Sequence, residues 1–330
     1  MNRSLRLLGL VLGVAIVVWM VVEADPAALF GVFPRIGWGF VAILAARGAT
    51  IIVDCAAWHC LLPRTERPSF AVMLPLRWIA EAINTTLPVA QIGGEVVRAR
   101  LLQRRIGAAG SNPAGQGAAS VAVDFTLALF AQVLFTLVGF ILLARLGDAA
   151  GWWPAALCAA SVPAFAVLSW ELLMRRRLLS AAARWAERLG QHRLGATLAA
   201  LGAALGLIAT SRAALGLSLA LHLASLIGHA GEVWLTLYLM GVSAGLANAV
   251  FLESLSLAAR SAAFLIPSGW GAQEGALIAL ASLAGLPADT GLALGLVKRA
   301  REFAIGLPGL LAWAIAERGG SRLVSRRPLR

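Results

Sequence analysis

Two segments of the chain combine a helix-breaking proline with a glutamate seven residues later. They are LPVAQIGGE, residues 87–95, and IPSGWGAQE, residues 266–274. Both lie in apolar surroundings, where a carboxylate is costly unless it finds a cation or takes up a proton. An ionisable side chain in such surroundings indicates a functional site. The two glutamates, Glu95 and Glu274, are therefore candidates for gating or for proton exchange.

Each glutamate needs a partner. Arg98 lies three residues after Glu95, so the two side chains can pair locally if the segment is helical. Glu274 has no basic neighbour within one helical turn. We therefore expect Glu274 either to pair with a basic side chain of the last apolar stretch or to exchange a proton.

The last apolar stretch, residues 288–316, carries four charged side chains near its middle: Lys298, Arg299, Arg301 and Glu302. A charge at the centre of a bilayer costs about 2.5–3.5 kcal/mol, so these groups need partners or a water-filled cavity. In such a cavity the guanidinium groups are suited to bidentate contacts with phosphate. The alternative is two shorter helices that meet at the membrane surface, with the arginines reaching into the headgroup region.

Three ionisable residues on one later span, His222, His229 and Glu232, lie close together along a helix. A metal site is one interpretation. Histidines that are hydrogen-bonded within the helix bundle are the favoured one, because no third helix offers an obvious set of ligands. We predict no metal and no cofactor.

Other polar residues in apolar segments are expected to form structural pairs. We expect Asp54 to pair with Arg47, and Asp124 to pair with Ser120. Glu81 and Arg260 each stand seven residues before one of the two prolines, and this correspondence suggests an ion pair between the two halves of the chain.

The composition defines the class of protein. Of the 330 residues, 60% are hydrophobic and only 13% are charged, and long apolar runs recur along the whole length. This is typical of a polytopic membrane protein. The net charge of +12 is concentrated in short arginine-rich segments between apolar runs, as expected for cytoplasmic loops that face anionic lipid. The charge does not indicate nucleic-acid binding.

We therefore predict an all-α polytopic fold with about six full transmembrane helices and two re-entrant broken-helix hairpins in an inverted-repeat arrangement. The six spans are residues 5–22, 38–62, 118–146, 153–174, 213–240 and 288–316. The breaks contain Pro88, Gly93, Gly94, Pro267, Gly269 and Gly271. Arginines flank the first hairpin but are scarce around the second, so the hairpins should enter from opposite faces, with both termini cytoplasmic.

The sequence predicts one integral membrane domain, residues 1–317. Its repeat-like halves are roughly residues 1–150 and 195–317, and an amphipathic connector lies at 178–212. Residues 318–330 are expected to be a basic, disordered cytoplasmic tail. The first apolar run is expected to be a retained helix rather than a cleaved signal peptide.

The segments LPVAQIGGEVVRARLL and IPSGWGAQEGALIAL resemble the hallmark segments of the flippase-like membrane domain of lysylphosphatidylglycerol synthases. The matching residues are Pro88, Gly93, Gly94, Glu95 and Arg98 in the first segment, and Pro267, Gly269, Gly271 and Glu274 in the second. The resemblance covers essentially the whole chain and is nearest to stand-alone members associated with hopanoid biosynthesis. It implies lipid handling in a bacterial inner membrane, without the aminoacyl transferase of the bifunctional relatives.

Three functions fit these features. The main expectation is a translocase or transport factor, not an enzyme, that moves a phospholipid, a hopanoid-related lipid or a lipid-linked headgroup between leaflets. The residues expected to bind or gate the headgroup are Glu95, Arg98, Glu274, Lys298, Arg299, Arg301 and Glu302. The alternatives are an integral membrane enzyme with Glu95 or Glu274 as general base, and a scaffold for lipid-biosynthesis proteins.

Overall fold

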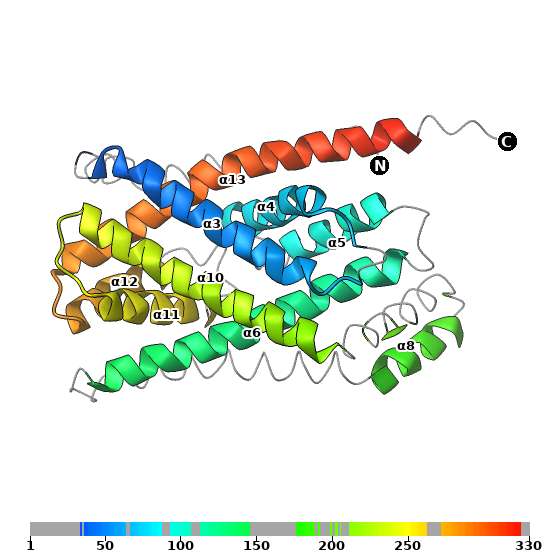
Figure 1. Cartoon of the computed structure of the whole chain (residues 1–330), viewed down its shortest axis with the longest axis horizontal. Coiled ribbons are helices and arrows are strands. Elements are labelled where there is room, and N and C mark those ends of the chain that lie inside the picture. The colour runs from blue at the N-terminus through cyan, green and yellow to red at the C-terminus, as the bar shows by residue number, and fades with distance from the viewer. Residues whose placement is uncertain are drawn as a thin grey trace.

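A computed structural model of the chain shows a bundle of helices in the residues that it describes (Figure 1). The structure describes residues 34, 36–63, 67–87, 93–106, 113–145, 176–188, 211–262 and 272–324, with a few single positions between 191 and 205. Within these residues all regular secondary structure is helical. The all-α prediction is confirmed for this part of the chain.

The helices fall into two series, separated by the helix α8. The first series is α3 (Gly39–His59), α4 (Phe70–Thr86), α5 (Gly93–Ile106) and α6 (Pro113–Arg145). The second is α10 (Arg212–Leu239), α11 (Leu246–Ala262), α12 (Ala272–Leu283) and α13 (Ala288–Val324). Helix α8 (Arg176–Arg188) forms where the amphipathic connector is expected, with Ala183 and Ala186 buried and Trp185 exposed.

Three of the described helices are long and apolar enough to cross a membrane. They are Gly39–His59, Gly117–Arg145 and Arg212–Leu239. Each matches one of the six expected spans. The expected spans 5–22 and 153–174 lie outside the described residues.

The last expected span, 288–316, is part of one continuous helix, α13, of 37 residues. It passes through the four charged side chains without a break and carries Pro308 inside it. The alternative of two shorter helices that meet at an interface is therefore wrong. Helix α13 also continues to Val324, so it includes residues 318–324 of the segment for which the composition predicts a tail.

Both broken segments form a pair of helices that pack against each other, α4 with α5 and α11 with α12. Pro88, Pro267, Gly269 and Gly271 lie outside the described residues. Gly93 and Gly94, which the sequence places in the first break, are instead the first two residues of α5. The reason for Gly94 is the close approach of α4, because a Cβ atom there would collide with the carbonyl oxygen of Ala80.

Asn84 of α4 completes the contact at the start of α5. Its side-chain oxygen accepts a hydrogen bond of 2.8 Å from the backbone N–H of Gly94. The first N–H groups of a helix have no partner inside that helix, so a side chain of the preceding helix here performs the task of a capping residue.

The two series pack in matching ways. Helix α4 lies against α13, and its counterpart α11 lies against α6. Helices α5 and α6 pack together, as do α12 and α13, while α3 and α10 lie side by side along their length (Figure 1). The two largest hydrophobic cores also correspond between the two series. One is built on α3, α4 and α5 around Trp58 and Met73, and the other on α10, α11 and α12 around Leu237 and Phe251.

The close approach at Gly94 predicts that Gly94→Ala lowers the melting temperature of the purified protein in detergent, because the methyl group must push α4 away from α5. Gly275→Ala is the matched control. Gly275 occupies an exposed position in the first turns of α12 with no described atom within 4 Å of the added carbon. Alanine favours a helix by up to about 1 kcal/mol over glycine, so the control should be neutral or slightly stabilising. Equal melting temperatures for the two variants would contradict the close approach.

Candidate functional site

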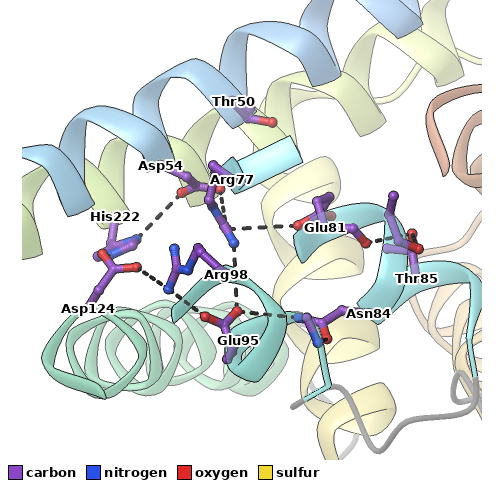
Figure 2. Close-up of polar contacts among 12 residues, drawn as sticks. Thr50, Asp54, Arg77, Glu81, Asn84, Thr85, Glu95, Arg98, Asp124 and His222 are labelled. Atoms are coloured by element: carbon purple, nitrogen blue, oxygen red, sulfur yellow. Dashed lines mark hydrogen bonds and ion pairs between the residues drawn. The ribbon is translucent and has the colours of Figure 1, made fainter. Parts of the chain in front are cut away.

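Charged side chains from eight helices meet inside the bundle rather than on its surface. Five members from the first series and His222 of α10 form a closed ring, which we call the charge ring (Figure 2). It consists of Arg77, Asp54, His222, Asp124, Arg98 and Glu95. These six side chains come from five helices, α4, α3, α10, α6 and α5. The ring is therefore a product of tertiary packing.

Arg98 is the most enclosed member of the charge ring, with a side chain that is 1% exposed. Its Nη2 atom donates to Glu95 Oε2 at 2.5 Å and to Asp124 Oδ2 at 2.9 Å. Its guanidinium carbon lies 4.4 Å from the centroid of the Trp58 ring, so the cation also contacts an aromatic face. The local pair of Glu95 and Arg98 that the sequence predicts is confirmed.

Arg77 closes the other side of the ring. Its Nη2 donates to Asp54 Oδ2 at 3.0 Å, and its Nη1 lies 3.8 Å from Glu95 Oε1. Asn84 donates a further hydrogen bond of 3.3 Å to the same glutamate oxygen. Glu95 thus holds contacts to two guanidinium groups and one amide.

Arg47 links the ring to the centre of the bundle. It donates to Glu81, which also lies 3.8 Å from Arg77, and to the Nε2 atom of His229. A guanidinium has only donors, so His229 must accept at Nε2 and is therefore a neutral imidazole.

The second charge cluster lies between α10, α11, α12 and α13. Glu302 accepts from Arg260 at 2.6 Å and from Arg299 at 2.8 Å. Arg299 also donates from Nε to Glu274 at 2.5 Å. Glu274, for which a partner in the last stretch is one of the two expectations, does pair with that stretch.

The two remaining charges of the last stretch also have partners. Arg301 donates from Nη1 to Glu232 at 2.5 Å, and Lys298 donates to Glu253. All of the sequence-predicted binding residues thus lie in one of two places: Glu95 and Arg98 in the charge ring, and the other five in the second cluster.

Three sequence-based pairs are wrong. Asp54 pairs with Arg77 rather than Arg47, and Asp124 pairs with Arg98 and His222 rather than Ser120, whose hydroxyl instead accepts from Trp58. Glu81 and Arg260 do not meet, because each binds a partner within its own cluster. The physical reason is that each of these groups finds a nearer partner on an adjacent helix.

The three ionisable residues of α10 turn to different partners. His222 contacts Asp54 and Asp124, His229 contacts Arg47, and Glu232 contacts Arg301. The interpretation as bundle hydrogen bonds is confirmed for both histidines. Among the residues that the structure describes, no group of three potential ligands could hold a metal ion.

Sequence reasoning missed Glu253 and the bridging role of Arg77. Both could have been found by the same signal, because each is an ionisable side chain inside an apolar helical segment. The partners themselves could not have been found in this way, since they lie on other helices.

One ion-pair group lies at the surface and provides a contrast. Glu317 of α13 accepts from Arg100 and, at 3.0 Å, from Arg104, both near the end of α5. All three side chains are substantially exposed. Such pairs contribute about 0–1 kcal/mol, so they are not expected to hold the bundle together.

The fold and the site together define a helical membrane protein whose interior charges are buried and paired. The chain belongs to the family of the lysylphosphatidylglycerol synthase TM region, whose family model matches residues 6–309. No curated protein and no solved structure matches the chain. The family identifies a membrane protein of lipid metabolism or transport.

The pairing predicts a large stability difference between two Glu→Gln variants. Glu302→Gln removes the charge that compensates Arg260 and Arg299 inside the bundle, and should cost about 3–5 kcal/mol. Glu317→Gln removes a surface charge and should cost about 0–1 kcal/mol. The measurement is thermal unfolding in detergent together with abundance in membranes. Similar losses in both variants would show that the buried pairs do not stabilise the fold.

Proposed function

We propose that the protein is a lipid translocase or lipid-transport factor that moves a phospholipid, a hopanoid-related lipid or a lipid-linked headgroup between the leaflets of the bacterial inner membrane. The observation that carries the proposal is the set of buried ion pairs inside a bundle in which α3, α6 and α10 are long and apolar enough to cross a membrane. A polar headgroup can pass through hydrocarbon only along such a polar interior.

The inverted-repeat arrangement is part of this proposal. Exchanging the first helix series for the second converts the α4–α13 contact into the α11–α6 contact, and the α5–α6 contact into the α12–α13 contact. This correspondence supports two structural repeats, each with one broken-helix hairpin. Transporters with repeats of opposite orientation bind their substrates near the bilayer midplane, at the interface between the repeats.

The headgroup would bind by replacing carboxylates. In the ion pairs of Arg98, Arg299 and Arg301 a carboxylate occupies the position that a phosphate would take. Phosphate can replace it without leaving the guanidinium uncompensated, because both groups accept the same pair of N–H donors. Glu95, Glu274 and Glu302 then act as gates that return to their arginines once the headgroup has left, and Lys298 supports the cluster through Glu253.

Two of the buried arginines have N–H groups that could bind a phosphate oxygen. Nε and Nη1 of Arg98, and Nε of Arg301, are buried and have no hydrogen-bond partner in the described part of the chain. Buried donors without a partner are costly, and polar ligands can satisfy them. Arg98 and Arg301 belong to different charge clusters, so each half of the pathway has a donor available for a phosphate oxygen.

Two other functions remain distinct from this one. An integral membrane enzyme would use Glu95 or Glu274 as general base, and a scaffold would hold lipid-biosynthesis proteins without moving lipid. Neither requires polar groups that run through both helix series. Leaflet-resolved lipid analysis of cells lacking the protein separates the translocase from both.

The proposed topology predicts the sides from which introduced cysteines react. In a variant that lacks the three native cysteines, cysteines placed at Arg67 and Arg105 should be labelled only from the cytoplasm. Those placed at Ser243 and Asp289 should be labelled only from outside. The measurement is labelling by a membrane-impermeant maleimide in intact and opened cells. Labelling of one pair from opposite sides would replace a re-entrant hairpin by a full span and remove the inverted repeat.

The gating role of the two glutamates predicts lost transport in Glu95→Gln and Glu274→Gln. Glutamine keeps the shape and hydrogen-bonding capacity of glutamate but cannot ionise. Translocation of a labelled phospholipid in proteoliposomes should fall to the rate of protein-free vesicles, while Glu317→Gln, at the surface ion pair, should keep the full rate. Glu274, with 19% of its side chain exposed, should tolerate the change better in abundance than the more enclosed Glu95. Normal translocation in both variants would refute a gating role for them.

A further inference from the structure

His222 occupies a position that only a doubly protonated imidazole satisfies. Its Nε2 lies 3.0 Å from Asp124 Oδ1, and its Nδ1 lies 3.5 Å from Asp54 Oδ1. A carboxylate oxygen accepts hydrogen bonds, and a neutral imidazole has only one N–H to donate. With a neutral ring, one nitrogen lone pair would face a carboxylate oxygen, which is repulsive. The imidazolium form donates on both sides.

The remaining oxygens of the two aspartates do not relieve this constraint. Asp54 Oδ2 accepts from Arg77, and Asp124 Oδ2 accepts from Arg98. Both carboxylates are therefore held ionised by a guanidinium, which makes a shared proton between aspartate and histidine unnecessary. His222 is itself buried, as are both aspartates.

The charge balance of the ring also favours the imidazolium form of His222. The charge ring contains three carboxylates and two guanidinium groups, with His222 as the sixth member. With an imidazolium the signs alternate around the ring and the total charge is zero. With a neutral imidazole the buried ring carries one uncompensated negative charge, which is costly in a bundle of low dielectric constant.

The other helices packed on α10 do not supply this charge. Arg47 of α3 is bound to Glu81 and His229. The basic side chains Arg260 of α11 and Lys298, Arg299 and Arg301 of α13 bond to glutamates: Glu302, Glu253, Glu274 and Glu232. Glu232 lies ten residues further along α10 than His222. His229 provides an internal comparison, because its contact with Arg47 requires the neutral form.

We propose that His222 is the proton-binding site that couples lipid movement to protons, an inference that rests on the proposed transport function. When the proton is bound, the ring is closed and ties α3, α6 and α10 to the first hairpin through Arg77 and Arg98. When the proton leaves to water, its electron pair stays on the ring nitrogen and one aspartate loses its donor. The ring then carries a net negative charge, which holds Arg98 more tightly and repels an anionic headgroup, so Arg98 becomes available to a headgroup phosphate only while the proton is bound.

The protonation state is tested directly in the wild-type protein. Protein labelled with ¹⁵N-histidine is placed in nanodiscs of anionic and zwitterionic phospholipid, and its four histidines are assigned by single substitutions. At about pH 7 the nitrogen chemical shifts should identify His222 as an imidazolium and His229 as a neutral imidazole. A neutral His222 at that pH overturns the proposal. Substituting each of the other three histidines in turn identifies their signals, and the signal that remains belongs to His222. The test therefore does not require a His222 variant that folds.

The coupling is tested in proteoliposomes that contain a fluorescent phospholipid, with and without an imposed proton gradient. Wild-type translocation should depend on the gradient, and His222→Gln should lose that dependence because an amide does not ionise in this range. The control is His59→Gln, since His59 contacts the backbone carbonyl of Pro68 and the ring of Phe70 and takes no part in the charge ring. That variant should behave as wild type.

The outcomes separate the two proposals. Wild-type lipid movement that ignores the gradient overturns the coupling and leaves the translocase function in place. An imidazolium at His222 with no lipid movement in the wild type overturns both the translocase function and the coupling, while the proton-binding site stands. Gradient dependence that survives in His222→Gln assigns the proton to another residue and overturns the role of His222.

Discussion

The pairing of buried charges is the constraint on which this structure depends. An ionised side chain inside a bundle of apolar helices has little water to solvate it, so each one must find a partner of opposite charge. Here most of the pairs join different helices: Arg77 of α4 with Asp54 of α3, Arg98 of α5 with Asp124 of α6, and Arg301 of α13 with Glu232 of α10. The ion pairs therefore fix how the helices lie against one another.

Stability alone does not explain why these charges are present. Replacing a buried ion pair with apolar side chains of similar volume is often neutral or stabilising, by about 1–4 kcal/mol. The surrounding cores, such as the one around Trp58 and Met73, already bury large apolar side chains. The proposed transport function would account for this many charges inside a membrane protein.

Helix α10 connects the two charge clusters. Its three ionisable side chains reach three different sets of partners: His222 the aspartates of α3 and α6, His229 the arginine of α3, and Glu232 the arginine of α13. A change of charge at one cluster can therefore act on the other through a single rigid helix. This arrangement gives a physical route between a proton-binding event and the movement of a hairpin.

The matching contacts of the two helix series place each hairpin against the last helix of the other series, α4 against α13 and α11 against α6. Inside the bundle each hairpin is thus held by ion pairs of its own series, while the other series contributes apolar packing and, at the surface of the first hairpin, the ion pairs of Glu317 with Arg100 and Arg104. An exchange of carboxylate for phosphate at Arg98 or Arg299 would alter the first without disturbing the second. Such a division allows a polar interior to rearrange inside a stable apolar shell.

The sequence by itself determined the class of protein and one ion pair. Apolar runs of membrane-spanning length follow from composition alone, and the Glu95–Arg98 pair follows from the 3.6-residue period of a single helix. The sequence also narrowed the partner of Glu274 to the last apolar stretch, where Arg299 occupies that place. These predictions needed only the spacing of residues along one helix, or the lack of any other basic residue near Glu274.

The tertiary structure decided the rest. Asp54 has Arg47 seven residues away on its own helix, yet its partner is Arg77 of α4, and Asp124 bonds to Arg98 and His222 rather than to the nearby Ser120. The sequence also did not predict that α13 is one continuous helix or that Asn84 caps the start of α5. The physical reason is that contacts within one helix are fixed by its period, whereas contacts between helices depend on which faces pack together. In a chain whose helices are apolar on nearly every side, the pattern of residues does not specify those faces.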